Sequence, residues 1–277
     1  MFVRILMFSA VVFACSKAPD ASGAPTPKPD KATSGDSSRA TTIMNAQISA
    51  IQDGDEAKVV DTFSADAVVL VPAARSAHAP SASLLTSIGG MDPAGESMKT
   101  IKVDKLVAGA NAGAVWWSAE LTVTTSRKTR KVHVTELATS DAKWKVVAGA
   151  FAHETAAEPA ADSALLSDKI TTAPGALSPL AADIPKLDAA LAKDTVVFGT
   201  DKGETAYGDV AAHAMLKGWS KLAFSLDGKP REMHGKDWAF AITTVNWQQP
   251  KEKVPARMSC LVIGTPTTVV AVQYTAN

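Results

Sequence analysis

The chain has 277 residues, of which 28 are lysine or arginine and 28 are aspartate or glutamate. A net charge of zero argues against nucleic-acid binding, because nucleic-acid binders carry a basic surplus. With only two cysteines in the chain, Cys15 and Cys260, disulfides are not what stabilises the fold.

The N-terminus has the pattern of a secretory signal. Residues 1–4 supply a basic start, and residues 5–14 form an apolar run. This run is shorter than the ~20 residues that a membrane-spanning helix needs. The pattern therefore predicts a signal peptide over residues 1–15.

The signal ends in Val12-Phe13-Ala14-Cys15, which resembles the lipobox of bacterial lipoproteins, although Phe13 departs from the small residue usual at that place. The resemblance implies that Cys15 is lipidated and becomes the mature N-terminus, and that Ser16 permits sorting to the outer membrane. The alternative is an ordinary signal cleaved near Ala14. We expect a cell-envelope lipoprotein held by the lipid on Cys15, at the outer membrane facing the periplasm.

Similar segments occur twice in the same order along the chain. The matching segments are residues 66–70 with 194–198, Gly113-x-x-Trp116 with Gly235-x-x-Trp238, and residues 146–148 with 269–271. A repeat this long indicates one architecture used twice. Residues 16–40 are rich in Pro, Ala, Ser and Thr and have almost nothing to bury, which predicts a disordered tether. The expected organisation is a signal peptide 1–15, a tether 16–40, a first domain 41–153, a linker 154–183 and a more divergent second domain 184–277.

In the first copy, Met44, Ile48 and Ile51 have helical spacing, so residues 42–63 are expected to be helical with a break at 53–55. The elements expected after them are a strand at 67–71, one short helix near 81–88, and strands at 114–125, 131–138 and 144–152. Long strands joined by short polar turns predict an antiparallel meander.

The second copy follows the same order. The expected elements are a short helix at 162–170 in the linker, helices at 185–192 and 209–222, and strands at 194–199, 223–227, 231–234, 237–248, 256–263 and 268–275. Asp209 is expected to cap the N-terminus of the longer helix.

The segments that suggest a known fold lie in the first copy, over roughly 42–153. They are Asp53-Gly-Asp55, Phe63-Ser-Ala-Asp66-Ala-Val-Val, Trp116-Trp117-Ser-Ala-Glu120-Leu, Val134-Thr-Glu136-Leu and Trp144-Lys-Val-Val-Ala148. In this order they resemble the SnoaL-like, ketosteroid-isomerase-like group of the nuclear-transport-factor-two-like superfamily. The resemblance implies an α+β fold of two cone-shaped domains, each a curved antiparallel sheet wrapped over helices with a pocket between them.

Enzymes of that group use a carboxylate and a phenol in an apolar pocket. The first copy has no tyrosine, and its Glu120 and Glu136 lie on adjacent expected strands. If both face the pocket, they form an acid/base pair. We favour a surface or interdomain position, because Ser118 and Thr122 share their expected face. The five histidines lack the spacing of metal ligands, so we expect no catalytic residue, metal or cofactor.

Aromatic and apolar side chains are the remaining candidates. The expected pocket-lining residues are Phe63, Leu84, Trp117, Met215 and Trp219, and the expected interdomain residues are Trp116, Glu120, Trp238 and Phe240. The face that bears Trp238 and Phe240 is too apolar to be left in water. We therefore expect the two domains to meet through their outer sheet faces, with Glu120 at the rim.

Two functions are consistent with these features. The first is a non-catalytic, lipid-anchored cell-envelope protein that binds a small apolar ligand or a protein partner. The alternative is an isomerase- or dehydratase-type enzyme that uses a pocket carboxylate. The second interpretation depends on the habit of the family rather than on residues of this chain.

Overall fold

The computed structural model describes residues 37–70, 96–153, 163–165, 175–201, 203–248, 250–251, 256–265 and 267–276. They all belong to one compact unit. The expected signal peptide with Cys15, the helix near 81–88 and the pocket candidate Leu84 lie outside the described residues. None of the described helices is both long and apolar enough to cross a membrane.

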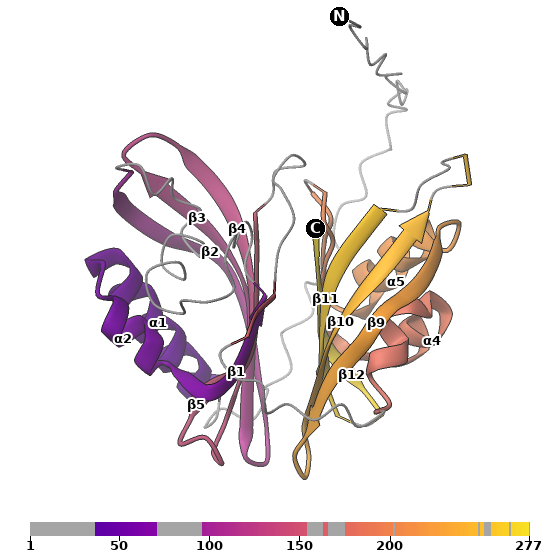
Figure 1. The fold of residues 1–277 in the computed structure, drawn as a ribbon, viewed down its shortest axis with the longest axis horizontal. Coiled ribbons are helices and arrows are strands. Elements are labelled where there is room, and N and C mark those ends of the chain that lie inside the picture. Colours follow the sequence, from indigo (N-terminus) through magenta and orange to yellow (C-terminus); the bar gives the residue numbers. More distant parts are fainter. Residues whose placement is uncertain are drawn as a thin grey trace, which may run out of the picture. The chain divides into compact units, whose positions relative to one another are not determined.

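The first sheet has six strands and carries two helices (Figure 1). Its elements are α1 (Ser37–Asp53), α2 (Glu56–Asp61), β1 (Phe63–Leu70), β2 (Met98–Asn111), β3 (Ala114–Thr125), β4 (Thr129–Thr139), β5 (Lys145–His153) and β6 (Ser163–Leu165). The strand order is β2-β3-β4-β5-β1-β6. The meander from β2 to β5 is antiparallel, as expected, whereas β1 pairs with β5 in parallel.

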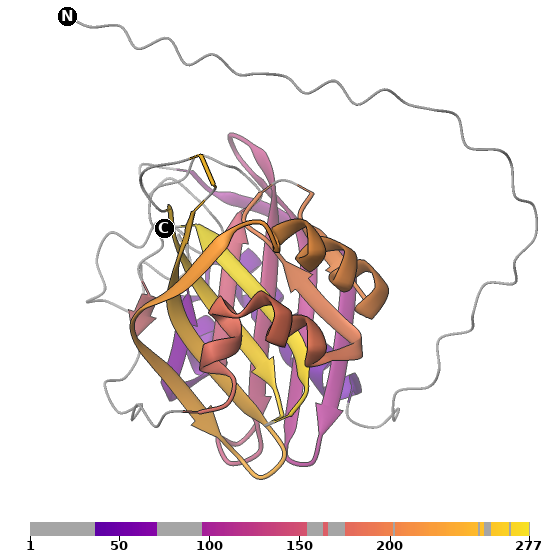
Figure 2. The same ribbon diagram turned by 90° about the vertical axis from the view of Figure 1, so that its right-hand side faces the viewer.

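The second sheet repeats this order (Figure 2 shows it with α4 and α5 in front). Its elements are η1 (Ser178–Ala182), α4 (Ile184–Ala189), β7 (Leu191–Phe198), β8 (Thr205–Tyr207), α5 (Asp209–Trp219), β9 (Ala223–His234), β10 (Ala239–Gln248), β11 (Ala256–Gly264) and β12 (Val269–Ala276). The order β9-β10-β11-β12-β7-β8 matches the first sheet over five strands, and β7 pairs with β12 in parallel as β1 does with β5. The outermost strands differ, because β8 precedes its meander in the chain whereas β6 follows its own. The α+β fold class, with curved sheets over helices, is therefore confirmed, and each sheet is mixed rather than purely antiparallel.

Helix α1 forms where the apolar spacing predicts it. Met44, Ile48 and Ile51 are buried against the first sheet. Gly54, with a φ of 69°, lies in the turn that follows the helix, because glycine adopts this left-handed conformation at little cost. The Asp55 side chain then accepts a hydrogen bond from Lys58 N and caps α2.

The structure differs from the expected elements in several places, among them β2, β6, β9 and the start of α5. Strand β2 was not expected, because its charged residues, such as Lys102 and Asp104, conceal the apolar alternation. Residues 163–165 form strand β6 rather than part of a helix. Strand β9 is continuous where two strands were expected. Gly208, not Asp209, is the N-cap of α5, since its φ of 82° suits glycine.

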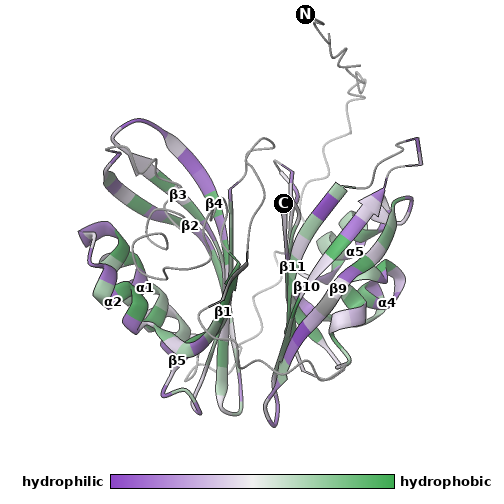
Figure 3. Cartoon of the chain, viewed as in Figure 1, coloured by the Kyte–Doolittle hydropathy of each residue, from purple (hydrophilic) through white to green (hydrophobic). Residues whose placement is uncertain are grey.

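Three clusters of buried side chains stabilise the unit. One lies between α1 and the first sheet, and a second lies between α4, α5 and the second sheet. The third contains residues of β1, β3, β4 and β5 together with residues of β10, β11 and β12, so it joins the two sheets. In Figure 3 the middle parts of the strands are mainly hydrophobic, whereas turns and strand ends are more hydrophilic.

Candidate ligand-binding site

The larger described cavity lies in the second sheet's helix-covered side. It has a volume of about 120 Å³, and its lining residues are Thr200, Asp201, Glu204, Trp219, Leu222, Phe224, Trp247, Met258 and Tyr274. By this measure a cavity needs about 10–15 Å³ to hold one water. The space is therefore large enough for a small organic group.

Four aromatic side chains dominate the lining. Trp219 comes from the end of α5, Phe224 from β9, Trp247 from β10 and Tyr274 from β12. The Trp219 and Tyr274 rings meet edge to face with centroids 5.3 Å apart, and Phe224 is inclined to both at 6.3–6.4 Å. Inclined rings can contact an enclosed group from several sides, which parallel stacking would not allow.

The register of the sheet brings two of these rings together. Trp247 lies directly opposite Phe224 across the β9–β10 pair. Side chains of directly opposite residues point to the same face of a sheet. The Tyr274 hydroxyl donates a hydrogen bond to the carbonyl oxygen of Ala181 at 2.9 Å, which fixes the ring from behind. Burial raises the pKa of Tyr274 well above its usual range, so this side chain is a neutral phenol.

Two carboxyl groups from the loop after β7 complete the lining. Glu204 accepts a hydrogen bond from Trp219 Nε1 at 3.0 Å and another from the Asp201 backbone N at 3.1 Å. Gly199 makes this approach possible. A Cβ at that position would lie 2.2 Å from Glu204 Oε2 and 2.8 Å from Trp219 Cζ2. The glycine therefore permits the carboxylate and the indole to meet at the edge of the cavity.

Of the pocket residues expected in the second copy, the structure places Trp219 in this lining and Met215 outside it. Met215 is half-buried and packs against the core under α5. Sequence reasoning did not single out Glu204, Phe224 or Trp247. Phe224 and Trp247 were expected on strands separated by a third, and only the continuous β9 brings them together across the β9–β10 pair.

The first copy has almost no free space under its helix. The gap between α1 and the sheet has a volume of about 10 Å³ and is lined mainly by apolar side chains, among them Met44, Ile48 and Phe151. Phe63 and Trp117, which were expected to line a pocket, are buried in this core. A space at the limit for one water cannot hold a ligand, so these two residues support the core in this structure.

Glu136 is fully buried in that core, which corrects its expected surface position. Its Oε1 accepts a hydrogen bond from Gln47 Nε2 of α1 at 3.0 Å. Desolvation raises the pKa of Glu136 to about 8, and the nearby Gln47 and Trp117 side chains lower it in part. Its second oxygen has no hydrogen-bond partner among the described residues. The carboxyl group is therefore protonated at neutral pH.

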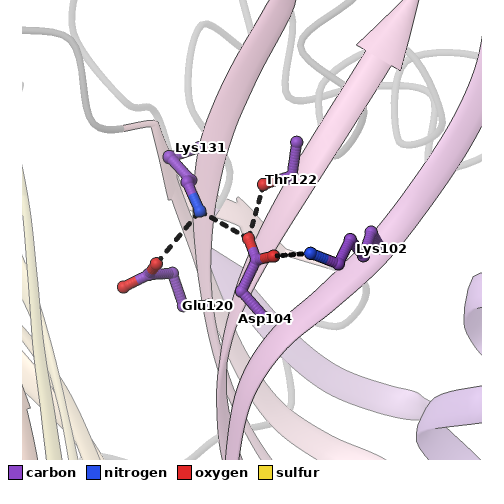
Figure 4. A network of polar contacts seen from close by, with 5 residues as sticks. All are labelled: Lys102, Asp104, Glu120, Thr122 and Lys131. Atoms are coloured by element: carbon purple, nitrogen blue, oxygen red, sulfur yellow. Dashed lines mark hydrogen bonds and ion pairs between the residues drawn. The ribbon is translucent and has the colours of Figure 1, made fainter.

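Glu120 lies on the opposite face of the same sheet and cannot pair with Glu136. Across β3 and β4, Glu120 is opposite His133, whereas Glu136 is opposite Trp117. Lys131 Nζ bridges Glu120 Oε1 at 3.2 Å and Asp104 Oδ2 at 2.5 Å (Figure 4). Hydrogen bonds from Lys131 and Thr122 hold the pKa of Asp104 well below its usual range. The register therefore rules out the acid/base pair of Glu120 with Glu136, the alternative that the sequence left open.

The expected interdomain tryptophans are buried in the cluster that joins the sheets. Trp116, Trp238 and Phe240 all belong to it. The Trp238 and Phe240 rings are parallel, with centroids 6.5 Å apart. Glycines permit the indoles to pack closely, since a Cβ at Gly109 would lie 2.5 Å from Trp116 and one at Gly235 would lie 2.0 Å from Trp238.

Two ring contacts and one hydrogen bond also link the two sheets. The His133 ring stacks on Phe198 with centroids 4.4 Å apart, and Gln273 Nε2 donates to the His133 carbonyl oxygen at 3.2 Å. Lys105 Nζ lies 3.4 Å from the centroid of the Tyr207 ring. Burial, and then the negative charge of Glu120, raise the pKa of Tyr207. Glu120 therefore lies close enough to the second sheet to act on it electrostatically.

No family model matches the chain, and no curated protein matches it. Solved structures do. An NTF2-like protein of unknown function from Pseudomonas putida is 19% identical, with 36% of this chain and 78% of that chain covered and a TM-score of 0.31. A protein with a cystatin-like fold from Methylobium petroleophilum is 13% identical, with 46% and 85% covered and a TM-score of 0.33. A putative isomerase of the SnoaL-like family from Agrobacterium tumefaciens is 20% identical, with 32% and 75% covered and a TM-score of 0.27.

These neighbours carry the family names that the sequence resemblance suggested. The fold of this chain rests on its own strand order and helix placement. The matches say nothing about its ligand or its reaction.

Proposed function

We propose that this chain is a non-catalytic, lipid-anchored protein of the cell envelope that binds a small, largely apolar ligand in the aromatic cavity of its second copy. The observation that carries the proposal is the contrast between the two helix–sheet spaces. One has a volume of about 120 Å³ and an aromatic lining, and the other, at about 10 Å³, is filled by its own side chains. Small-molecule sites are concave and mostly apolar, with a few placed polar groups.

The arrangement around the cavity supports binding rather than catalysis. Glu204 is engaged by two hydrogen bonds, and the Tyr274 hydroxyl is turned to Ala181. Proton-transfer catalysis needs an acid or base within hydrogen-bond reach of the reacting atom. The Tyr274 hydroxyl already donates to the backbone and Glu204 already accepts from the Trp219 indole, so both groups are better suited to shaping the cavity than to transferring protons.

Anchoring is the second element of the proposal. The lipobox-like residues Val12 to Cys15 and the uncharged run before them support lipidation of Cys15. A tether that ends where α1 begins, at Ser37 rather than at the expected residue 40, would let the folded unit sample the space near the membrane surface. A binding protein held in this way would retain its ligand at the envelope.

A fluorescence titration tests the binding proposal. The neutral apolar probe N-phenyl-1-naphthylamine should bind the full chain with increased emission. Phe224→Ala removes one wall of the cavity and should weaken binding about tenfold or more, since such a ring buries 150 Å² or more of surface. Leu226→Ala is the matched control, because Leu226 lies on the same strand, is 40% exposed and does not line the cavity. Equal affinity of both variants would contradict the proposal.

One observation favours the enzymatic alternative. Glu136 is a buried carboxyl group with a pKa of about 8 beside the Gln47 amide, and such perturbed groups are concentrated at active sites. Against it, the adjacent space is too small for a substrate. Exchange of deuterium from D₂O into the α-position of small ketones would reveal proton abstraction. Exchange catalysed by the wild type and abolished in Glu136→Gln would establish the enzyme and refute the non-catalytic proposal.

A further inference from the structure

The cavity of the second copy combines aromatic rings with acidic groups, a combination that favours positively charged ligands. Trp219, Phe224, Trp247 and Tyr274 supply four π systems around one space. The face of an aromatic ring is electronegative and attracts a cation, most strongly for tryptophan. A purely apolar ligand would have no use for the two carboxyl groups in the same lining.

The charge of the lining is negative in its described part. Asp201 and Glu204 are its ionisable acids, and none of the nine lining residues is basic. No described lysine, arginine or histidine forms an ion pair with either acid, although ion pairs are common elsewhere on the described chain. The two negative charges are therefore not neutralised by a neighbouring described residue.

The position of Glu204 strengthens this field. Its oxygens accept hydrogen bonds from Trp219 Nε1 and from the Asp201 backbone, so the carboxylate is fixed against the edge of the indole. Gly199 is needed for this close approach, because a Cβ at that position would collide with Glu204 and Trp219. Gly199 thus allows the Glu204 carboxylate to lie beside Trp219 at the cavity. A cation over the indole ring would be attracted by the ring and by the carboxylate.

We infer that the cavity takes an organic cation, a small quaternary or alkylated ammonium group, rather than a neutral apolar ligand. This inference rests on the proposed function, since it names the class of ligand for the same cavity. The alkyl groups of an alkylammonium ion present an apolar surface to the aromatic rings, and its positive charge is attracted by Glu204 and Asp201. A metal ion would find only two carboxyl groups in this lining, and no cluster of three or more His, Cys, Asp or Glu side chains that could hold it occurs among the described residues.

Two probes of equal shape and different charge test the inference. Choline carries a quaternary ammonium group, and 3,3-dimethylbutan-1-ol is its neutral carbon counterpart. Isothermal titration of the full chain should give a choline Kd about tenfold or more below that of the alcohol. Glu204→Gln keeps an acceptor for Trp219 Nε1 and removes the charge, so it should weaken choline binding several-fold more than it weakens binding of the alcohol. Asp66→Asn makes the same charge change at an exposed site on β1 and should alter neither Kd.

Each outcome decides between the claims. Equal or tighter binding of the alcohol overturns the cation inference and leaves the proposed binding function standing. Failure of choline to bind, while N-phenyl-1-naphthylamine binds in a Phe224-dependent manner, also overturns the inference alone. Failure of all three probes overturns the proposed function with it. If Glu204→Gln lowers the melting temperature, Asp201→Asn provides the second test, since Asp201 is exposed and donates only its backbone N–H.

Discussion

Replacing Glu136 by glutamine should change how the stability of this protein depends on pH. Glu136 is fully buried, and its pKa is about 8 in the folded chain against an ordinary value of 4.5. A carboxyl group whose pKa is raised by folding holds its proton in the native state after the unfolded state has lost it. The native state then binds more protons, so the free energy of unfolding falls as pH rises from 4.5 to 8 and levels off above.

The size of the effect follows from these two values. One pH unit is equivalent to about 1.4 kcal/mol, so the wild type should lose about 4 kcal/mol through Glu136 between pH 4.5 and pH 8. Glutamine has nearly the same shape, does not ionise, and keeps a carbonyl oxygen for the hydrogen bond from Gln47 Nε2. Glu136→Gln should therefore be close to wild type at pH 4.5 and more stable than wild type by up to about 4 kcal/mol at pH 8.

Urea unfolding followed by tryptophan fluorescence at pH 5, 6, 7 and 8 measures this directly. The difference between variant and wild type cancels every other titrating group, and it should grow by about 1.4 kcal/mol per pH unit within the window. Asp66→Asn, at an exposed carboxylate, should show no such growth. A Glu136→Gln variant whose stability tracks the wild type at every pH would refute the buried, protonated carboxyl group.

Three further predictions test other parts of the structure. Gly199→Ala should lower the affinity for N-phenyl-1-naphthylamine and destabilise the chain by about 1–3 kcal/mol, because the new Cβ meets Glu204 and Trp219. Gly218→Ala, with open space around it, should change neither property for the worse. Thermal melts measure the stability and titrations the affinity, and a Gly199→Ala variant unaffected in both would contradict the packing. Trp238→Ala should destabilise the chain by about 3–5 kcal/mol in urea unfolding, because Trp238 is buried in the cluster that joins the two sheets. The exposed Leu226 provides the control, and Leu226→Ala should change the stability little. A loss below 1 kcal/mol for Trp238→Ala would contradict the role of that cluster. Cys15→Ser should move the protein from the membrane fraction to the soluble fraction on cell fractionation; an unmodified, soluble wild type would end the lipoprotein proposal.

The sequence predicted the elements that have clear periodicity. Helix α1 followed from the spacing of Met44, Ile48 and Ile51, and the meander strands β3 to β5 followed from alternation between polar turns. Strand β2 escaped because its residues are half-exposed and several are charged. A strand that is exposed to solvent along most of its length has few apolar residues in alternation, so its sequence resembles that of a loop.

The site depended on register, which the sequence does not state. Across β3 and β4 the paired residue numbers add to 253, as for Glu120 with His133 and Trp117 with Glu136. An odd sum places Glu120 and Glu136 on opposite faces, and a slip of one residue would reverse this. Glu204 was missed because its position depends on the space that Gly199 leaves beside Trp219, and a contact of this kind has no local sequence signature.

The central claim is that the aromatic cavity of the second copy is the ligand site, and the chain's six tryptophans provide a direct test of it. In a ¹H–¹⁵N NMR titration with N-phenyl-1-naphthylamine, with each indole N–H assigned by a single Trp→Phe substitution, the signals of Trp219 and Trp247 should shift with the ligand. Those of Trp116, Trp117 and Trp238, which are buried in other clusters, should stay in place. Shifts at these three indoles with none at Trp219 and Trp247 would contradict the account.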